Sequence, residues 1–157
     1  MLKIPDQLIS NRIILRPYRM DDLEPLYGLM RDERVTKFLN FNEEQKTYEG
    51  TKSLLESIIH SYATEKPIFA LAIEERSSFL FLGSCGLSLK EEPHVAECFY
   101  ALCYEYWKNG YAVEAIRTLF HYAFKSMHLQ KIIVYVHPHN TNSWRLAERS
   151  GMRYMGH

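Results

Sequence analysis

The segment with the clearest chemical pattern is a polar, glycine-containing loop between a strand-like run and a helix-like run. It contains Lys108, Asn109 and Gly110, and the small residue Ala112 follows at the start of the helix. A tight loop before a helix directs several backbone N–H groups at one point, and the helix dipole adds to their positive potential. The pattern predicts a phosphate or pyrophosphate site, although a single glycine here also fits an ordinary turn. It is neither a Walker loop nor a dinucleotide fingerprint, because no Gly-Lys-Ser/Thr follows and only one glycine is present.

A carboxylate stands in the middle of the strand-like run that precedes this loop. Glu97 has apolar neighbours in sequence, and strand alternation puts it on the same face as Phe99 and Ala101. Burial of a lone carboxylate is costly and raises the pKa of such a group, which suits it to accept a proton near neutral pH. The alternatives are an exposed glutamate on an edge strand and a structural ion pair with Arg or Lys.

A third polar segment, 137–143, follows a second strand-like run and precedes the last helix-like run. Asn140 and Ser143 are natural helix caps, but the carboxyl ends of strands are also where α/β sheets bind ligands. The two histidines of this segment have no Cys, Asp or Glu at ligand spacing, so we predict no metal. A Ser/His/Asp triad lacks a nucleophile elbow, and nothing supports Cys103 as a nucleophile.

Hydrophobic periodicity predicts the elements that position these residues. Asp21 or Asp22 can cap the first helix, whose apolar face repeats at helical spacing. The expected fold is α/β (α+β), with a mixed, mostly antiparallel sheet and a central β-α-β unit flanked by helices. The expected elements are strands over 12–16, 68–73, 79–89 and 94–103, a strand buried on both faces over 131–136, polar turns over 74–78 and 90–93, and helices from residue 23, over 43–62, 110–127 and 141–149.

Length and composition set outer limits on the function. The chain has 157 residues, which predicts a single domain over 1–157. Lys and Arg total 19, as do Asp and Glu, so the basic surface of a nucleic-acid binder is not expected. We expect neither a membrane helix nor a signal peptide, because no apolar run approaches the ~20 residues that a membrane helix needs. Three cysteines inside apolar runs favour the reducing cytoplasm over a disulfide framework.

Three motifs occur in order along the chain: Arg12–Pro17 with Met20–Leu23, then Ala96–Ala115, then Asn140–Met152. Together they resemble the GNAT N-acetyltransferase superfamily, and most closely its Rim-type branch, which acetylates ribosomal-protein N-termini. The resemblance covers nearly the whole chain. It implies transfer of an acetyl group from acetyl-CoA to a protein N-terminus or a small primary amine, without a metal and in some members as a homodimer.

The resemblance also implies which residues hold the cofactor. The superfamily's pyrophosphate loop reads Gln/Arg-x-x-Gly-x-Gly/Ala, which Gly110 and Ala112 match, while Trp107 replaces Gln/Arg. Backbone amides of the loop are expected to bind the pyrophosphate, and the end of the preceding strand is expected to pair with the pantetheine arm. The implied cofactor residues are Ala101, Leu102, Cys103, Lys108, Asn109, Gly110, Tyr111, Ala112 and Asn140.

The implied catalytic residues are Glu97 as general base and Ser143 as the acid that protonates the CoA thiolate. Many superfamily members use a tyrosine for the second role, and that position is Ala147 here. A backbone N–H near Leu102 is expected to stabilise the oxyanion. Family members usually add two strands after the last helix, whereas this sequence ends at His157, so we expect short or missing C-terminal strands. Two other hypotheses remain open: a catalytically inactive acyl-CoA-binding or interaction module on the same fold, and an α/β domain whose loop binds another phosphate ligand or none.

Overall fold

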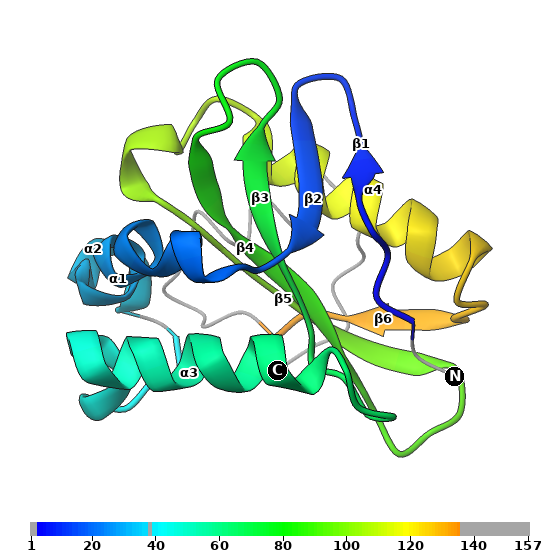
Figure 1. Cartoon of the computed structure of the whole chain (residues 1–157). Coiled ribbons are helices and arrows are strands. Elements are labelled where there is room, and N and C mark those ends of the chain that lie inside the picture. The colour runs from blue at the N-terminus through cyan, green and yellow to red at the C-terminus, as the bar shows by residue number, and fades with distance from the viewer. Residues whose placement is uncertain (1–2, 38, 136–157) are drawn as a thin grey trace.

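The computed structural model describes residues 3–37 and 39–135. In this part of the chain, six strands form one sheet in the order β1-β2-β3-β4-β5-β6 (Figure 1). Neighbouring strands are antiparallel except for β5 and β6, which are parallel and are joined by a helix. The strands are β1 Leu8–Ile9, β2 Ile13–Pro17, β3 Phe69–Glu75, β4 Phe81–Leu89, β5 Val95–Leu102 and β6 Lys131–Ile133.

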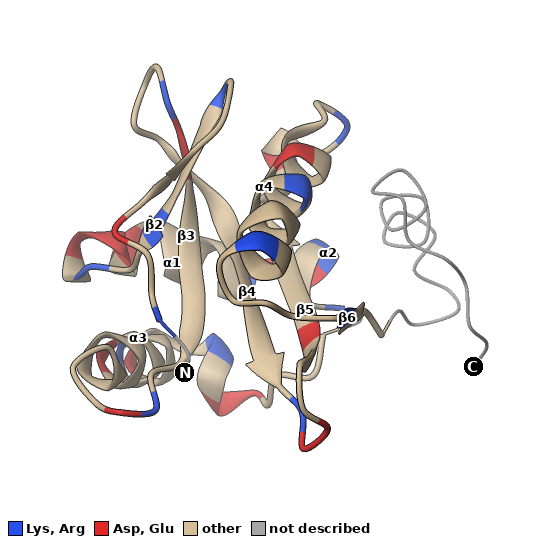
Figure 2. Cartoon of the chain, turned by 90° about the vertical axis from the view of Figure 1, so that its right-hand side faces the viewer, with Lys and Arg blue, Asp and Glu red and all other residues tan. Residues whose placement is uncertain are grey.

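Helices cover both faces of the sheet. Figure 2 shows α4 on one side and α1 and α3 on the other. The α-helices are α1 Leu23–Arg31, α2 Glu33–Thr36, α3 Tyr48–Ser61 and α4 Tyr111–Lys125, and the 3-10 helices are η1 Met20–Asp22, η2 Glu44–Lys46 and η3 Tyr104–Tyr106. None of the helices in residues 3–37 and 39–135 has the length and apolar character that crossing a bilayer requires.

Two apolar clusters, one on each face of the sheet, form the core. Strand β3 contributes to both because its side chains alternate: Phe69, Leu71 and Ile73 pack on the α4 side. Ala70 and Ala72 pack against α1 and α3. A strand buried on both faces in this way reads as an apolar run rather than as an alternating pattern. The mixed, mostly antiparallel sheet and its β-α-β unit are therefore as predicted.

The boundaries differ from the prediction in several places; for example, the strand predicted over 131–136 ends at Ile133, and the one predicted over 79–89 begins at Phe81. The helix predicted over 43–62 is divided, because the Thr47 side chain accepts a hydrogen bond from the Gly50 N–H and starts α3 after η2. The turn predicted over 74–78 begins later, because Glu74 and Glu75 continue β3. The pattern does not predict β1 and α2, which are too short to show a period.

Two further expectations concern the sheet edge and the first helix. Within the described sheet, β6 is an edge strand whose Lys131 is exposed and whose isoleucines are half-buried, so the expected burial on both faces is wrong. Asp22 is the N-cap residue of α1, but its carboxylate accepts hydrogen bonds from Arg16 and from the Arg19 N–H instead of capping that helix. The predicted last helix over 141–149, the C-terminal strands expected to be short or missing, Asn140 and Ser143 lie outside the described residues.

Candidate active site

The predicted anion loop connects β5 to α4. After β5 the chain makes one 3-10 turn and then places two residues in the left-handed region, Lys108 at a φ of 66° and Gly110 at 79°. Gly110 adopts this conformation without strain, whereas a residue with a side chain loses about 1–2 kcal/mol. Gly110 is also the N-cap residue of α4 and has no side chain to accept from the first turn. The backbone N–H groups of that turn are therefore directed at the loop, as an anion site requires.

Trp107 ties the loop to the end of β5. Its indole Nε1–H donates to the Leu102 carbonyl over 2.8 Å, and its ring centroid lies 4.9 Å from that of Tyr104. The sequence identified Trp107 only as a departure from the family's Gln/Arg. Its hydrogen bond shows how this chain fixes the start of the loop without that side chain.

The edge of β5 that faces β6 offers backbone groups to an extended ligand. The Cys103 N–H donates to the Leu82 carbonyl over 2.8 Å. Because hydrogen-bonding direction alternates along a strand, Ala101 and Cys103 face β4, while Leu102 faces the opposite edge. Pairing of β5 with β6 extends from Val95 to Glu97 in the described residues, so the edge beyond Glu97 has no strand partner there. Among the three residues predicted to pair with pantetheine, Leu102 therefore presents its N–H to this edge.

Glu97 lies on β5 at the point where this pairing stops. Its side chain is 35% exposed, and its Oε1 lies 3.3 Å from the Lys90 Nζ. Glu97 is therefore not the desolvated carboxylate that its apolar sequence neighbours predict. Its contacts match the alternative of an ion pair with a lysine. Strand rise separates Glu97 from Leu102 by roughly 16 Å over five residues. A base at this position can reach a group near Leu102 only through intervening water.

A cavity of about 420 Å³ lies at the end of β5, on the α1 side of the sheet. Cys103 is part of its wall, so the cavity borders the start of the anion loop. Its acidic side chains are not all free, because Asp22 pairs with Arg16 and Asp32 pairs with Arg34. The lining residues are Arg16, Arg19, Asp21, Asp22, Pro25, Gly28, Leu29, Asp32, Phe79, Leu80, Phe81, Cys103, Tyr104, Glu105 and Tyr106.

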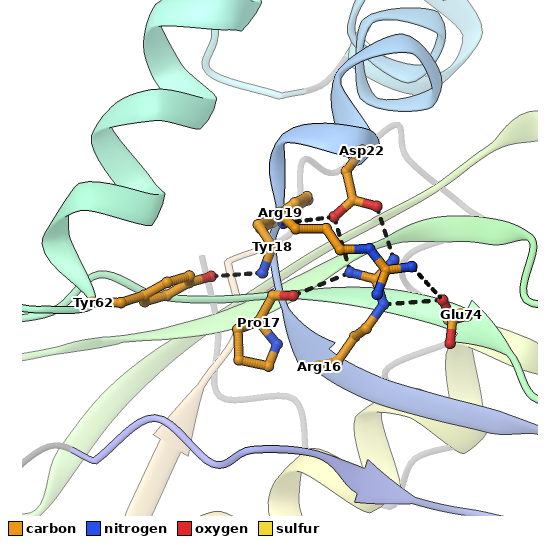
Figure 3. Close-up of polar contacts among 7 residues, drawn as sticks. All are labelled: Arg16, Pro17, Tyr18, Arg19, Asp22, Tyr62 and Glu74. Atoms are coloured by element: carbon orange, nitrogen blue, oxygen red, sulfur yellow. Dashed lines mark hydrogen bonds and ion pairs between the residues drawn. The ribbon is translucent and has the colours of Figure 1, made fainter.

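A buried ion network, drawn in Figure 3, contributes Arg16, Arg19 and Asp22 to the lining of the cavity. The Arg16 guanidinium donates to both Asp22 carboxylate oxygens over 2.9 and 2.8 Å and to Glu74 Oε1 over 3.0 Å. Arg19 approaches Glu74 to 3.6 Å from the exposed side. Burial alone would lower the pKa of Arg16, but the two carboxylates raise it above its ordinary value. The sequence signal for this network is an arginine at the end of the predicted apolar strand 12–16, which periodicity alone does not pair with Glu74.

This architecture corresponds to a known family. A sequence profile of the acetyltransferase (GNAT) domain matches residues 12–153. The chain belongs to the GNAT acetyltransferase family. The matched region includes β5, the anion loop and α4, and it agrees with the resemblance inferred from the three sequence motifs.

Curated relatives of this acetyltransferase cover nearly all of the chain. The uncharacterized N-acetyltransferase YoaA of Bacillus subtilis is 27% identical over 150 residues, which are 95% of this chain and 84% of YoaA. The uncharacterized N-acetyltransferase p20 of Bacillus licheniformis is 28% identical over 145 residues, which are 90% of this chain and 79% of p20. This GNAT domain is thus an acetyltransferase.

Solved structures show the same fold. A GNAT acetyltransferase from Bacillus anthracis superposes with a TM-score of 0.82 at 24% identity, covering 96% of this chain and 85% of the other. The ribosomal-protein-S5-alanine acetyltransferase of Vibrio fischeri gives 0.76 at 17% identity, with 92% and 81% covered. The spermidine N-acetyltransferase of Vibrio cholerae, in complex with CoA and spermine, gives 0.79 at 21% identity, with 94% and 85% covered. The Rim-type resemblance thus has structural neighbours in that branch, and a neighbour on this fold binds CoA.

The remaining candidate groups of this acetyltransferase are the cysteines, as nucleophiles, and the side chains that could ligate a metal. All three cysteines are buried and unpaired, and burial raises the pKa of the Cys103 thiol to about 12, so it is protonated at neutral pH. Within the described residues, no three His, Cys, Asp or Glu side chains are grouped as metal ligands.

Proposed function

We propose that this GNAT domain is an N-acetyltransferase that moves the acetyl group of acetyl-CoA to a primary amine by direct attack in a ternary complex. The observation that carries the proposal is the continuity of two features. In the described part of the chain, pairing of β5 with β6 stops at Glu97, and the β5 edge beyond that point leads into a loop that opens on the N-terminus of α4. An extended pantetheine arm fits the first, and a pyrophosphate fits the second.

The cofactor residues then divide by the group they bind. Backbone N–H groups from Lys108 to Ala112 bind the pyrophosphate. The strand end from Ala101 to Cys103 lies along the pantetheine arm, with the Leu102 N–H directed at the thioester oxygen. Asn140 contacts the cofactor from the last predicted helix.

The chemistry requires a neutral amine, because only its lone pair attacks the thioester carbon. Glu97 accepts the amine proton through water, the new N–C bond forms, and the C–S bond breaks. Ser143 or water returns a proton to the departing thiolate sulfur. The Leu102 N–H stabilises the developing oxyanion, a contribution of about 3–4 kcal/mol in well-studied oxyanion holes.

The acceptor is a protein N-terminus or a small amine. An α-amine has a pKa near 7.7–8.0 and a lysine amine near 10.4, so an N-terminus needs less help to lose its proton. The acidic side chains Asp21 and Glu105 around the cavity favour a cationic acceptor. A neighbour that binds spermine on this fold supports including polyamines among the candidates. The cytoplasm, where free thiols persist, is the proposed location, and a homodimer is compatible with this function.

Cofactor binding is tested first by thermal unfolding with acetyl-CoA, with ATP as the control. A ligand at 100 times its Kd adds about 2.7 kcal/mol to the free energy of unfolding. We expect a higher Tm with acetyl-CoA and little change with ATP. A folded protein whose Tm does not respond to acetyl-CoA contradicts the proposal.

Catalysis is tested with Glu97→Gln, assayed for CoA release over a panel of N-terminal peptides and small amines. Because Glu97 also pairs with Lys90, the matched control is Lys90→Met, which removes the ion pair and keeps the carboxylate. We expect Glu97→Gln to lower kcat by about 10²–10⁴-fold, the usual contribution of a general base, and Lys90→Met to retain turnover. Wild type that binds acetyl-CoA and acetylates no amine would instead favour an inactive acyl-CoA-binding module.

A further inference from the structure

Arg12, which precedes β2, contacts the anion loop from a position far away in sequence. Its Nη1 donates to the Asn109 carbonyl over 2.9 Å. Its guanidinium carbon lies 4.4 Å from the centre of the Tyr111 ring. A Cβ atom added to Gly110 would lie 3.3 Å from the Arg12 Nη2. One side chain therefore contacts the residues on both sides of Gly110, Asn109 in the loop and Tyr111 at the helix start.

The same arginine also binds the acidic residue of the first turn of α4. The Arg12 Nε donates to Glu114 Oε1 over 2.8 Å, and the Arg12 backbone N–H donates to Glu114 Oε2 over 2.8 Å. Burial alone would raise the pKa of Glu114, but the hydrogen bonds and charge of Arg12 hold it below its ordinary value. Glu114 is therefore an anion within one turn of the place where another anion is proposed to bind.

Two like charges at one helix N-terminus oppose each other. Glu114 stabilises the helix dipole by itself, but its negative charge repels a pyrophosphate at the same helix end. The planar guanidinium of Arg12 spans the Glu114 carboxylate and the Asn109 carbonyl together, which a lysine ammonium does not match in geometry. Arg12 thus compensates the charge and holds the loop.

We infer that Arg12 is a positioning residue for pyrophosphate binding: it fixes the carbonyl of Asn109, so that the following N–H groups face the ligand, and it neutralises Glu114. This inference rests on the proposed function, because it assumes that the loop binds the pyrophosphate of CoA. Arg12 does not touch the reacting atoms. Its side chain is 43% exposed and lies outside both apolar clusters, so its removal leaves the core intact.

The test compares two acyl donors that share a thioester and differ in the pyrophosphate. Acetyl-CoA has it, and S-acetylpantetheine does not. We expect Arg12→Gln to raise KM for acetyl-CoA and Kd for CoA by about tenfold or more, because the loop loses the charge-assisted hydrogen bond that holds the Asn109 carbonyl. Its kcat/KM for S-acetylpantetheine stays within about twofold of wild type, less than 0.5 kcal/mol.

The matched control is Arg76→Gln. Arg76 lies beside the turn that precedes β2, where its Nη1 donates to the Ser10 carbonyl. We expect this control to leave KM and kcat/KM for both donors at their wild-type values. The double variant Arg12→Gln with Glu114→Gln recovers part of the lost CoA affinity, because no uncompensated carboxylate remains.

The results that overturn the inference differ from those that overturn the proposed function. If Arg12→Gln lowers kcat/KM equally for both donors, Arg12 has a merely structural role. If the variant leaves the Kd for CoA unchanged, Arg12 has no role in pyrophosphate binding. No recovery in the double variant refutes the neutralisation of Glu114. If wild type itself does not bind CoA, the proposed function fails before the variants are compared.

Discussion

The three cysteines illustrate how burial controls side-chain reactivity. Burial raises the pKa of the Cys98 and Cys103 thiols to about 12 and that of Cys85 well above its ordinary value. Since the thiolate is the reactive form, we expect the folded protein to react slowly with Ellman's reagent at pH 8 and to release three equivalents of colour after denaturation.

The same thiols predict how stability responds to alkaline pH. Their folded pKa values lie above the ordinary value near 9, so the unfolded chain loses these protons first. The stabilisation is complete below pH 9 and declines as pH rises toward 12. Urea unfolding between pH 7 and 11 measures the trend. A free energy of unfolding that does not fall above pH 9, or rapid thiol reaction of the folded protein, would contradict the assigned burial.

At this scale the sequence predicts residue types better than their partners. Glu97 was singled out because a carboxylate interrupts an apolar strand. Its approach to Lys90 depends on the register of the β4–β5 hairpin, which the predicted strands over 79–89 and 94–103 do not give. Arg12 gave no signal as a loop contact, because Asn109 and Glu114 are distant in sequence. Asn140 and Ser143 keep their predicted roles as hypotheses.

At the scale of the elements, a buried ion network joins Arg16 on β2 to Glu74 on β3. Arg16 → Met leaves the carboxylates of Asp22 and Glu74 buried, with the exposed Arg19 as the remaining cation near Glu74. Breaking a buried ion network by removing one partner costs about 3–5 kcal/mol, so we expect a loss of this size in urea unfolding.

The matched control for this network is Arg34→Met. It breaks an ion pair with Asp32 whose arginine is 60% exposed, so the urea midpoint should hardly change. Equal losses in the two variants would show that Arg16 contributes no more than a surface charge does.

For the whole molecule, two apolar clusters share one sheet. The predicted single domain implies that both clusters unfold in one transition. Leu55→Ala in α3 and Leu119→Ala in α4 each truncate a side chain with no exposed area, at a cost of about 2–5 kcal/mol. Because the sheet separates the two sites, their effects should add in the double variant. Two separate transitions in calorimetry, each shifted by one variant, would contradict a single domain.

More of the fold than of the candidate site could be predicted from the sequence. Apolar alternation and helical spacing indicated β2 to β6, α1 and α4, because each is long enough, or bounded sharply enough, to show its period. Periodicity does not show that β6 lies at the edge of the sheet formed by the described residues, nor that a Thr47 cap sets the start of α3. The anion loop could be predicted from its glycine and from the family pattern. The contacts by which Trp107 and Arg12 hold it are tertiary, so the sequence does not show them.

The contacts of Arg12 have a consequence for the order of events during synthesis. Arg12 and Glu114 are 102 residues apart, so most of the chain must leave the ribosome before they meet. Contacts of such separation form late, because a long loop must close before they contribute. The loop therefore reaches its binding shape only after β2 and α4 have docked on the same sheet. A nascent chain released before α4 would contain every strand from β1 to β5 and still lack the support for its cofactor loop.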